Sequence, residues 1–329
     1  MTKRIRVSTF LKKLGEGTSE PLIVLGDDNE RYILKNQKIE SKGGFVEFNC
    51  MFLNEILSSR IANYLDVPVP KFAIAELDKR ILDNGPALRF VHRFTEGTHY
   101  ASKEIANTES NLRENFKMLK DMGKPYISRT WNRFYESIVN KEDIAKIIAF
   151  DLLIANFDRY NNTGNLLVAK TEKGRKLFSI DHGHAFFGPV WNTDKIGSLK
   201  SAGISKEYLD LFINSFLMIY PNKGYMGGLG EVFRAIENNI DLGNCLNHSF
   251  QLVVHKIESI QESIVNDWFN DIPDVWFVDR ISQSGFYKHF LLNQKSLVRW
   301  LIQAMADRGA FSNYRGGNLQ WIEKIAGTV

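Results

Sequence analysis

The chain has little of several features that would assign it to a specialised class of protein. Its only two cysteines, Cys50 and Cys245, lie far apart in sequence and in apolar surroundings. Neither a disulfide framework nor a cysteine metal site is therefore predicted, and both thiols are expected to be reduced core residues of a cytoplasmic protein. The basic N-terminal segment lacks the long apolar stretch of a signal peptide, and Asp151 interrupts the apolar run of 147–154, so no membrane span is expected.

An excess of charge of one sign is also missing. The 42 Lys and Arg residues against 38 Asp and Glu residues leave a net charge of +4. Such a small basic excess is weak evidence for nucleic-acid binding, and a direct interaction with nucleic acid is not expected. The hydrophobic fraction of 44% and the aromatic fraction of 12% are ordinary for a globular protein with a sizeable core. The length of 329 residues allows one large domain or two lobes.

Hydrophobic patterns change in character along the chain. In the first hundred residues, strands are predicted at 21–25, 31–35, 71–77 and 87–94. One helix is predicted among them, at 47–65. A short hairpin is predicted at 166–169 and 176–180, and helices at 112–122, 142–155, 206–218, 230–238, 248–266 and 284–305. This order predicts an α+β, two-lobed fold, with a strand-rich N-lobe (1–95), a helical C-lobe (96–305) and a peripheral tail (306–329).

Lys35 ends the predicted strand R-Y-I-L-K, downstream of the loop G-E-G-T-S. A lysine in this place can reach the α- and β-phosphates of a nucleotide, and backbone amides of the loop can cover the phosphates. The loop residues expected to do so are Gly15, Gly17, Thr18 and Ser19. By itself the pattern also fits a surface lysine beside an ordinary loop.

Glu55 lies on the predicted helix that follows Lys35, on a face shared with apolar residues. An unpaired carboxylate on such a face would be costly, and Lys35 is its natural partner. Such an ion pair would fix the position of the lysine. The alternative is a glutamate on the flank of the helix that faces solvent.

Two carboxylates and an amide follow in the order that phosphoryl transfer requires. Asp158, in N-F-D-R after the predicted helix 142–155, is the candidate base, and Asp151 is expected to accept hydrogen bonds within the loop. Asn165 precedes one strand of the predicted hairpin and Asp181 follows the other, so the hairpin would bring both to one end. Their oxygens suit Mg²⁺. Singly, each of these residues also fits an ordinary turn.

His182 and His184 flank Gly183 and raise the alternative of a transition-metal site. No third ligand is visible in the sequence, so loop packing or exposure to solvent is the preferred interpretation.

The ordered set of motifs resembles the HipA-like kinases, a bacterial family related in fold to protein kinases and phosphatidylinositol kinases. The resemblance covers roughly residues 14–305. Its early motifs are G-x-S-x-P at 17–21, Y-I-L-K ending at Lys35, Asn54-Glu55 and L-D-V-P-V-P at 65–70. Its later motifs are N-F-D-R at 156–159, N-L-L-V at 165–168, I-D-H-G at 180–183 and I-P-D-V-W at 272–276.

The resemblance implies ATP-dependent phosphorylation of a protein hydroxyl. It implies that Lys35, with Glu55 as its partner, binds phosphates, that Asp158 is the catalytic base, and that Asn165 and Asp181 hold Mg²⁺. Adenine would lie against 90–95, with Phe90, Val91, His92, Arg93 and Phe94 as the candidate contacts. Some members of the family are toxins with an antitoxin partner, and some phosphorylate a serine of their own phosphate loop, for which Thr18 and Ser19 are the candidates here.

Two positions depart from the family pattern. The residue after Asp-Arg is commonly His, and here it is Tyr160. The metal-binding Asn usually lies five residues after the Asp, where this chain has Thr163. Asn165, seven residues after Asp158, is preferred because it adjoins the strand, and Asn162 is the alternative. The irregular spacing also keeps open an ATP-binding pseudokinase, and a small-molecule phosphotransferase of the aminoglycoside type would use a similar set of residues.

Overall fold

The computed structural model describes residues 1–14, 21–41, 44–85, 88–89, 91–109, 118, 122–123, 127–160, 164–219 and 229–323. Five strands near the N-terminus close into a small barrel, in the order β1 (Arg4–Lys13), β2 (Leu22–Gly26), β3 (Arg31–Leu34), β7 (Gly97–Lys103) and β6 (Phe72–Leu77). The pairs are antiparallel except for β1 with β6. A separate small core of apolar side chains fills this barrel.

The barrel confirms part of the predicted strand order. The predicted hairpin is formed by β2 and β3 around a turn in which Asn29 has a φ of 61°. β1 was not predicted, because only Ile5 and Val7 of its ten residues are buried and its pattern is therefore weak.

The predicted strand at 87–94 is wrong. None of its described residues belongs to a strand, and the strand of this region begins later, at Gly97. Arg93 has a φ of 57°, which is incompatible with an extended strand. Phe94 is buried in the core of the barrel.

A two-stranded ribbon and a buried helix connect β3 to β6. The ribbon is formed by β4 (Lys38–Ser41) and β5 (Gly44–Glu47), and the helix is α1 (Met51–Tyr64). The helix therefore begins four residues after its predicted start. It is buried on nearly every side, which places its polar residues Asn54 and Glu55 inside the protein. A short helix, α2 (Lys79–Asn84), follows β6.

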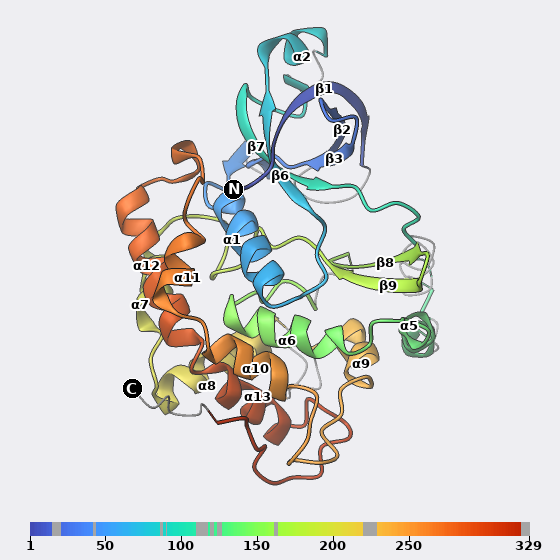
Figure 1. Ribbon diagram of the computed structural model, residues 1–329, viewed down its shortest axis with the longest axis vertical. Helices are drawn as coiled ribbons and strands as arrows, with labels where there is room; N and C mark the ends of the chain where they lie inside the picture. The colour runs from blue at the N-terminus through green and yellow to red at the C-terminus, as the bar shows by residue number, and fades with distance from the viewer. Residues whose placement is uncertain are drawn as a thin grey trace.

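The remainder of the described chain is helical apart from one hairpin, β8 (Leu166–Thr171) with β9 (Gly174–Ser179). Its helices are α5 (Ile127–Glu136), α6 (Asp143–Leu153), α7 (Thr193–Ser201), α8 (Lys206–Ile219), α9 (Glu231–Glu237), α10 (Gln251–Glu258), α11 (Glu262–Asp267), η2 (Asp274–Trp276), α12 (Arg280–Gln294) and α13 (Val298–Asp307). One large apolar core runs from α1 through α6 to α13. Figure 1 shows the barrel at one end, then α1 and α6 below it, with α10 and α13 lying further towards the other end.

Several predicted helices have different limits in the structure. The helix predicted at 248–266 is divided into α10 and α11, because Gln261 has an extended backbone. The helix predicted at 284–305 is divided into α12 and α13 by a turn at 295–297. α7 was not predicted, and most of the predicted helix 112–122 lies outside the described residues.

The α+β fold predicted from the sequence is confirmed, with strands gathered towards the N-terminus and helices after them. Within the described ranges, no helix has both the length and the apolar character needed to cross a bilayer. Both cysteines are free, but only Cys50 is a core residue, because Cys245 is half-buried.

Candidate active site

Lys35 lies directly after β3 and is almost completely buried. Its Nζ forms an ion pair with Oε1 of Glu55 on α1, and lies 2.7 Å from Oδ1 of Asp181. The predicted pairing of Lys35 with Glu55 is therefore present, and Asp181 joins it. Burial alone would lower the pKa of the lysine, but the two carboxylates outweigh it and raise this pKa, so the ammonium stays charged.

Glu55 contacts both the lysine and the segment after β9. Its Oε1 also accepts a hydrogen bond of 3.1 Å from the backbone N–H of His182. Burial would raise the pKa of the Glu55 carboxyl, but the Lys35 ammonium outweighs burial and holds the pKa below its usual range. Glu55 is thus an ionised, buried carboxylate that links α1 to the barrel and to the residue after Asp181.

Asp181 lies at the end of β9, where the backbone turns with a φ of 59°. Burial would raise the pKa of its carboxyl, and the nearby Lys35 ammonium lowers it to about 2. The neighbouring His182 is buried, shares a hydrogen bond of 2.9 Å with Ser179 and has a lowered pKa because of desolvation, so it is neutral at pH 7.

Asn165 and Asp181 lie at the same end of the β8–β9 hairpin, as predicted. Leu166 pairs with Ser179 in the hairpin, and the N–H of Ile180 donates to the carbonyl oxygen of Asn165 at 3.1 Å. The side-chain amide of Asn165 donates to Oδ2 of Asp158 at 3.0 Å. Asp158 and Asn165 are therefore in direct contact although they are seven residues apart, while Asn162 lies outside the described residues.

Arg159 fixes the loop that carries Asp158. It is fully buried, and its guanidinium donates to Asp151 at 2.6 and 2.9 Å and to the carbonyl oxygens of Asn165 at 2.7 Å and Ile180 at 3.0 Å. One side chain thereby holds the ends of both hairpin strands against α6. Asp151 accepts hydrogen bonds within the loop, as expected from the sequence.

Tyr160 stands where the family commonly has His, and its side chain has a partner in this chain. Its hydroxyl donates to Oδ2 of Asp151 at 3.0 Å, and its ring is buried. The tyrosine therefore belongs to the same hydrogen-bonded group that holds Arg159.

The residues expected to contact a nucleotide are only partly within the described chain. Gly15, Gly17, Thr18, Ser19 and Phe90 lie outside it. Of the remaining candidates, Val91 is exposed and the side chain of Phe94 lies in the barrel core. The carbonyl oxygen of His92 accepts a hydrogen bond from Asn36. The guanidinium of Arg93 lies over the ring of Phe45. Their role in binding adenine stays a prediction.

The oxygen atoms of the site suit a hard cation. The amide nitrogen of Asn165 is engaged by Asp158, so the amide oxygen is the atom that this side chain would offer to a metal ion. With the Asp181 carboxylate it forms an oxygen donor set of the kind that Mg²⁺ accepts. No group of three His, Cys, Asp or Glu side chains suited to a metal is found among the described residues.

Sequence reasoning missed several polar residues that surround this site. Arg159 belongs to the N-F-D-R motif, but no function was predicted for it. No function was predicted for Lys195 or Tyr287 either. Asn54 had a signal, because it adjoins Glu55 in an otherwise apolar helix. Lys195 and Tyr287 have no local signal, since they reach the site only through the tertiary fold.

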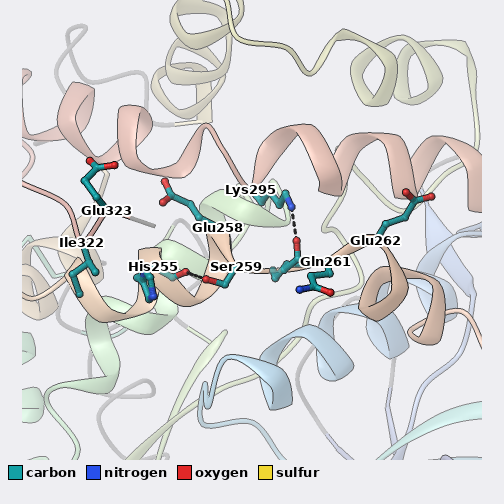
Figure 2. A pocket seen from close by; sticks show the side chains of 9 residues that line it. His255, Glu258, Ser259, Gln261, Glu262, Lys295, Ile322 and Glu323 are labelled. Carbon is teal, nitrogen blue, oxygen red and sulfur yellow. Dashed lines mark hydrogen bonds between the residues drawn. The ribbon is translucent and has the colours of Figure 1, made fainter. Parts of the chain in front are cut away.

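A cavity of about 720 Å³ lies elsewhere in the molecule, beside α10, α11 and α12 (Figure 2). It is lined by His255, Glu258, Ser259, Ile260, Gln261, Glu262, Lys295, Ile322 and Glu323. None of the residues predicted to carry the chemistry lines this cavity, so it is distinct from the group formed by Lys35, Glu55 and Asp181.

Comparison with known proteins identifies the family of the chain. The model of the HipA-like kinase family matches residues 7–198, and no curated protein matches the chain. The Helicobacter pylori proinflammatory kinase CtkA is a similar solved structure, with 15% identity and a TM-score of 0.48 over 95% of this chain and 98% of that chain. Hydra Fam20, solved with sugar, has 11% identity and a TM-score of 0.37 over 95% and 88% of the two chains. Because the family model spans more than half of its residues, this chain belongs to the HipA-like kinase family.

Proposed function

We propose that this kinase transfers the γ-phosphoryl group of Mg-ATP to a serine or threonine hydroxyl of a protein. The observation that carries the proposal is the group of Lys35, Glu55 and Asp181, in which the lysine and the glutamate are buried, and which joins the barrel, α1 and the hairpin. A lysine–glutamate ion pair and a carboxylate placed for Mg²⁺ are the two conditions that kinases require for phosphoryl transfer.

Each residue has a definite part in the proposed reaction. Bound Mg-ATP would supply the phosphoryl group and the positive charge of the metal. Lys35 binds phosphate oxygens, while Glu55 keeps the ammonium in place. Asp181 and the amide oxygen of Asn165 would hold Mg²⁺. Asp158 would orient the acceptor hydroxyl and take its proton as the new oxygen–phosphorus bond forms, while the bond between the γ-phosphorus and the bridging oxygen of ADP breaks and ADP leaves.

The hydrogen bond between Asp158 and Asn165 supports an active enzyme over a pseudokinase. It shows that the longer spacing still brings the base candidate and the metal ligand candidate together. A toxin-type activity, an antitoxin-like partner, autophosphorylation and a cytoplasmic location complete the proposal. They are supported by the family and by the sequence rather than by the geometry of the site.

Intact mass after incubation with Mg-ATP, with release of ADP followed in parallel, tests the proposal. The wild type is expected to release ADP and to add about 80 Da per phosphate to itself or to a protein acceptor. Asp158→Asn and Asp181→Asn are each expected to lower the rate by about 10²-fold or more, because proton transfer and metal binding are lost. Asp83→Asn changes an exposed carboxylate on α2 and should behave as the wild type does.

Other outcomes would identify the alternatives. Phosphate transfer to a small molecule, with none to protein, would indicate a phosphotransferase of the aminoglycoside type. Binding of ATP without release of ADP from any form would indicate a pseudokinase. Absence of ATP binding would contradict the proposed function altogether.

A further inference from the structure

The loop that follows Asp181 has an unusual backbone. Phe186 and Phe187 have φ values of 56° and 63°, in the left-handed region that favours glycine. Such residues cost about 1–3 kcal/mol each and persist only where the surroundings hold them in place. Contacts of residues 183–188 with neighbouring helices therefore decide where this loop, and Asp181 before it, can lie.

Asn54 of α1 provides one set of these contacts. Its side-chain amide nitrogen lies 2.7 Å from the carbonyl oxygen of Gly183, 2.9 Å from that of Ala185 and 3.1 Å from that of Gly188. All three neighbours are acceptors, so the donor end of the amide must face the loop. Asn54 is fully buried.

Lys195 of α7 provides the second set. Its ammonium is almost fully buried and donates to the carbonyl oxygens of Phe186 at 2.7 Å and Gly188 at 2.6 Å. Among the described residues, no carboxylate forms an ion pair with it. Burial lowers the pKa of Lys195 to about 7, with the nearby Cys50 thiol acting in the opposite direction. Charged or neutral, the amino group remains a donor, and the carbonyl oxygens of the loop are its acceptors.

Tyr287 of α12 connects the two donors. Its hydroxyl donates to Oδ1 of Asn54 at 2.7 Å, and its ring lies 5.2 Å below the ammonium of Lys195. We call Asn54, Lys195 and Tyr287 the loop clamp. It joins three helices that are far apart in sequence beneath one short loop.

We propose that the loop clamp positions Asp181 for metal binding, with Asn54 and Lys195 as positioning residues of the phosphoryl-transfer reaction. The proposal rests on the proposed function of Asp181. Asn54 and Glu55 are consecutive on α1: Glu55 accepts from the N–H of His182, and Asn54 donates to the carbonyl of Gly183. The residues directly after Asp181 are thus held to the same turn of helix that fixes Lys35.

Removal of Lys195 would leave the carbonyl oxygen of Phe186 buried without its side-chain donor, whereas that of Gly188 would keep the amide of Asn54. Such an oxygen costs about 1–3 kcal/mol, which favours a loop that relaxes away from its present course. A misplacement of about 1 Å at a reacting group can lower a rate by roughly 10²-fold. The clamp therefore acts on the metal-dependent step, while Lys35 and Glu55 keep their contact with each other.

Lys195→Met tests the proposal, because methionine fills similar space without a donor. Its kcat is expected to fall by about 10- to 100-fold, and the Mg²⁺ concentration for half-maximal activity to rise severalfold. Calorimetry measures the affinity for ADP in both proteins. Without Mg²⁺, the affinity of the variant should lie within about twofold of that of the wild type. Added Mg²⁺ should increase the affinity of the variant less than it increases that of the wild type. Lys195→Arg, which keeps charge and donors, should recover part of the Mg²⁺ response.

Lys200→Met is the matched control, because Lys200 lies on the same helix with its side chain exposed. If Lys195→Met retains the Mg²⁺ response of the wild type and of this control, the proposal is overturned, whatever its melting temperature. If Lys195→Met does not fold, Tyr287→Phe, which removes one oxygen atom, decides the question by the same measurements. A wild type that binds no nucleotide and releases no ADP would instead overturn the proposed function, and the clamp proposal with it.

Discussion

Gly183 lies where α1 closely approaches the loop that follows Asp181. A Cβ atom at this position would lie 2.8 Å from Cγ of Met51 and 3.5 Å from Oε1 of Glu55. The first distance is shorter than a normal contact, and Met51 is itself buried in the helix. Gly183→Ala is therefore expected to push the loop away from α1, lowering the stability by about 1–3 kcal/mol, as overpacking does, and the rate of ADP release with it.

Gly197 offers the matched control for this substitution. It lies within α7, and a Cβ atom there would meet nothing within 4 Å. Gly197→Ala is expected to stabilise the protein by about 0.5–1 kcal/mol, because alanine loses less conformational entropy in a helix. Urea unfolding of both variants, with the ADP assay alongside, measures the contrast. If Gly183→Ala and Gly197→Ala have equal free energies of unfolding, the loop at Gly183 can move away from α1 without a loss of stability.

At the scale of elements, Asp151 connects α6 to the loop that carries Asp158 and, through Arg159, to the hairpin. The charge of its carboxylate balances Arg159, which has no exposed surface. Asp151→Asn keeps the shape of the side chain but leaves the guanidinium buried without a counterion. A loss of stability of about 3–5 kcal/mol is expected, because a broken buried pair leaves an uncompensated charge. ADP release should fall as well, since Arg159 holds the ends of β8 and β9.

The control for Asp151→Asn is an exposed ion pair of similar geometry. Asp66 lies 2.6 Å from Nζ of Lys256, and most of its side chain is open to solvent. Asp66→Asn also keeps a residue that tolerates the left-handed backbone at this position. A change of less than about 1 kcal/mol is expected, as for exposed pairs in general. Urea unfolding compares the two variants, and similar losses would contradict the importance assigned to Arg159.

The elements that the sequence predicted well are those with a strong local pattern. The β2–β3 hairpin, α6 and the β8–β9 hairpin combine apolar runs with turn residues and lie close to their predicted ranges. β1 and β7 were missed because few of their side chains follow a clear alternation, and α7 because much of it is polar. The breaks that separate α10 from α11 and α12 from α13 are set by tertiary packing, which a local pattern does not contain.

In the candidate site, too, some residues could be predicted from the sequence and others could not. Lys35, Glu55, Asp158, Asn165 and Asp181 were predicted because the chemistry of phosphoryl transfer requires those residue types in that order, and the structure gathers three of them directly. Arg159, Lys195 and Tyr287 form hydrogen bonds with backbone atoms or with other side chains around the site. Their contacts join positions as far apart as 54 and 287, and nothing in the sequence marks such pairs.

For the whole molecule, Lys35 is the point where the barrel, α1 and the hairpin meet. Lys35→Met would leave Glu55 buried without its cation, at a cost of about 3–5 kcal/mol near neutral pH. The size of this loss should depend on pH. In the wild type the pKa of Glu55 lies below its usual 4.5, so its stabilisation is complete above that value and disappears as pH falls further. In the variant, burial raises the same pKa, and the folded protein gains stability on acidification by binding a proton.

The difference in unfolding free energy between wild type and Lys35→Met is therefore expected to be largest near pH 8 and to shrink steadily towards pH 5. Urea unfolding at intervals over this range measures it. Lys103→Met removes a lysine from the outside of the same barrel, where its pair with Glu30 is partly exposed, and should lower stability by less than about 1 kcal/mol at every pH. A difference for Lys35→Met that does not change with pH would mean that Glu55 does not depend on Lys35 for its charge.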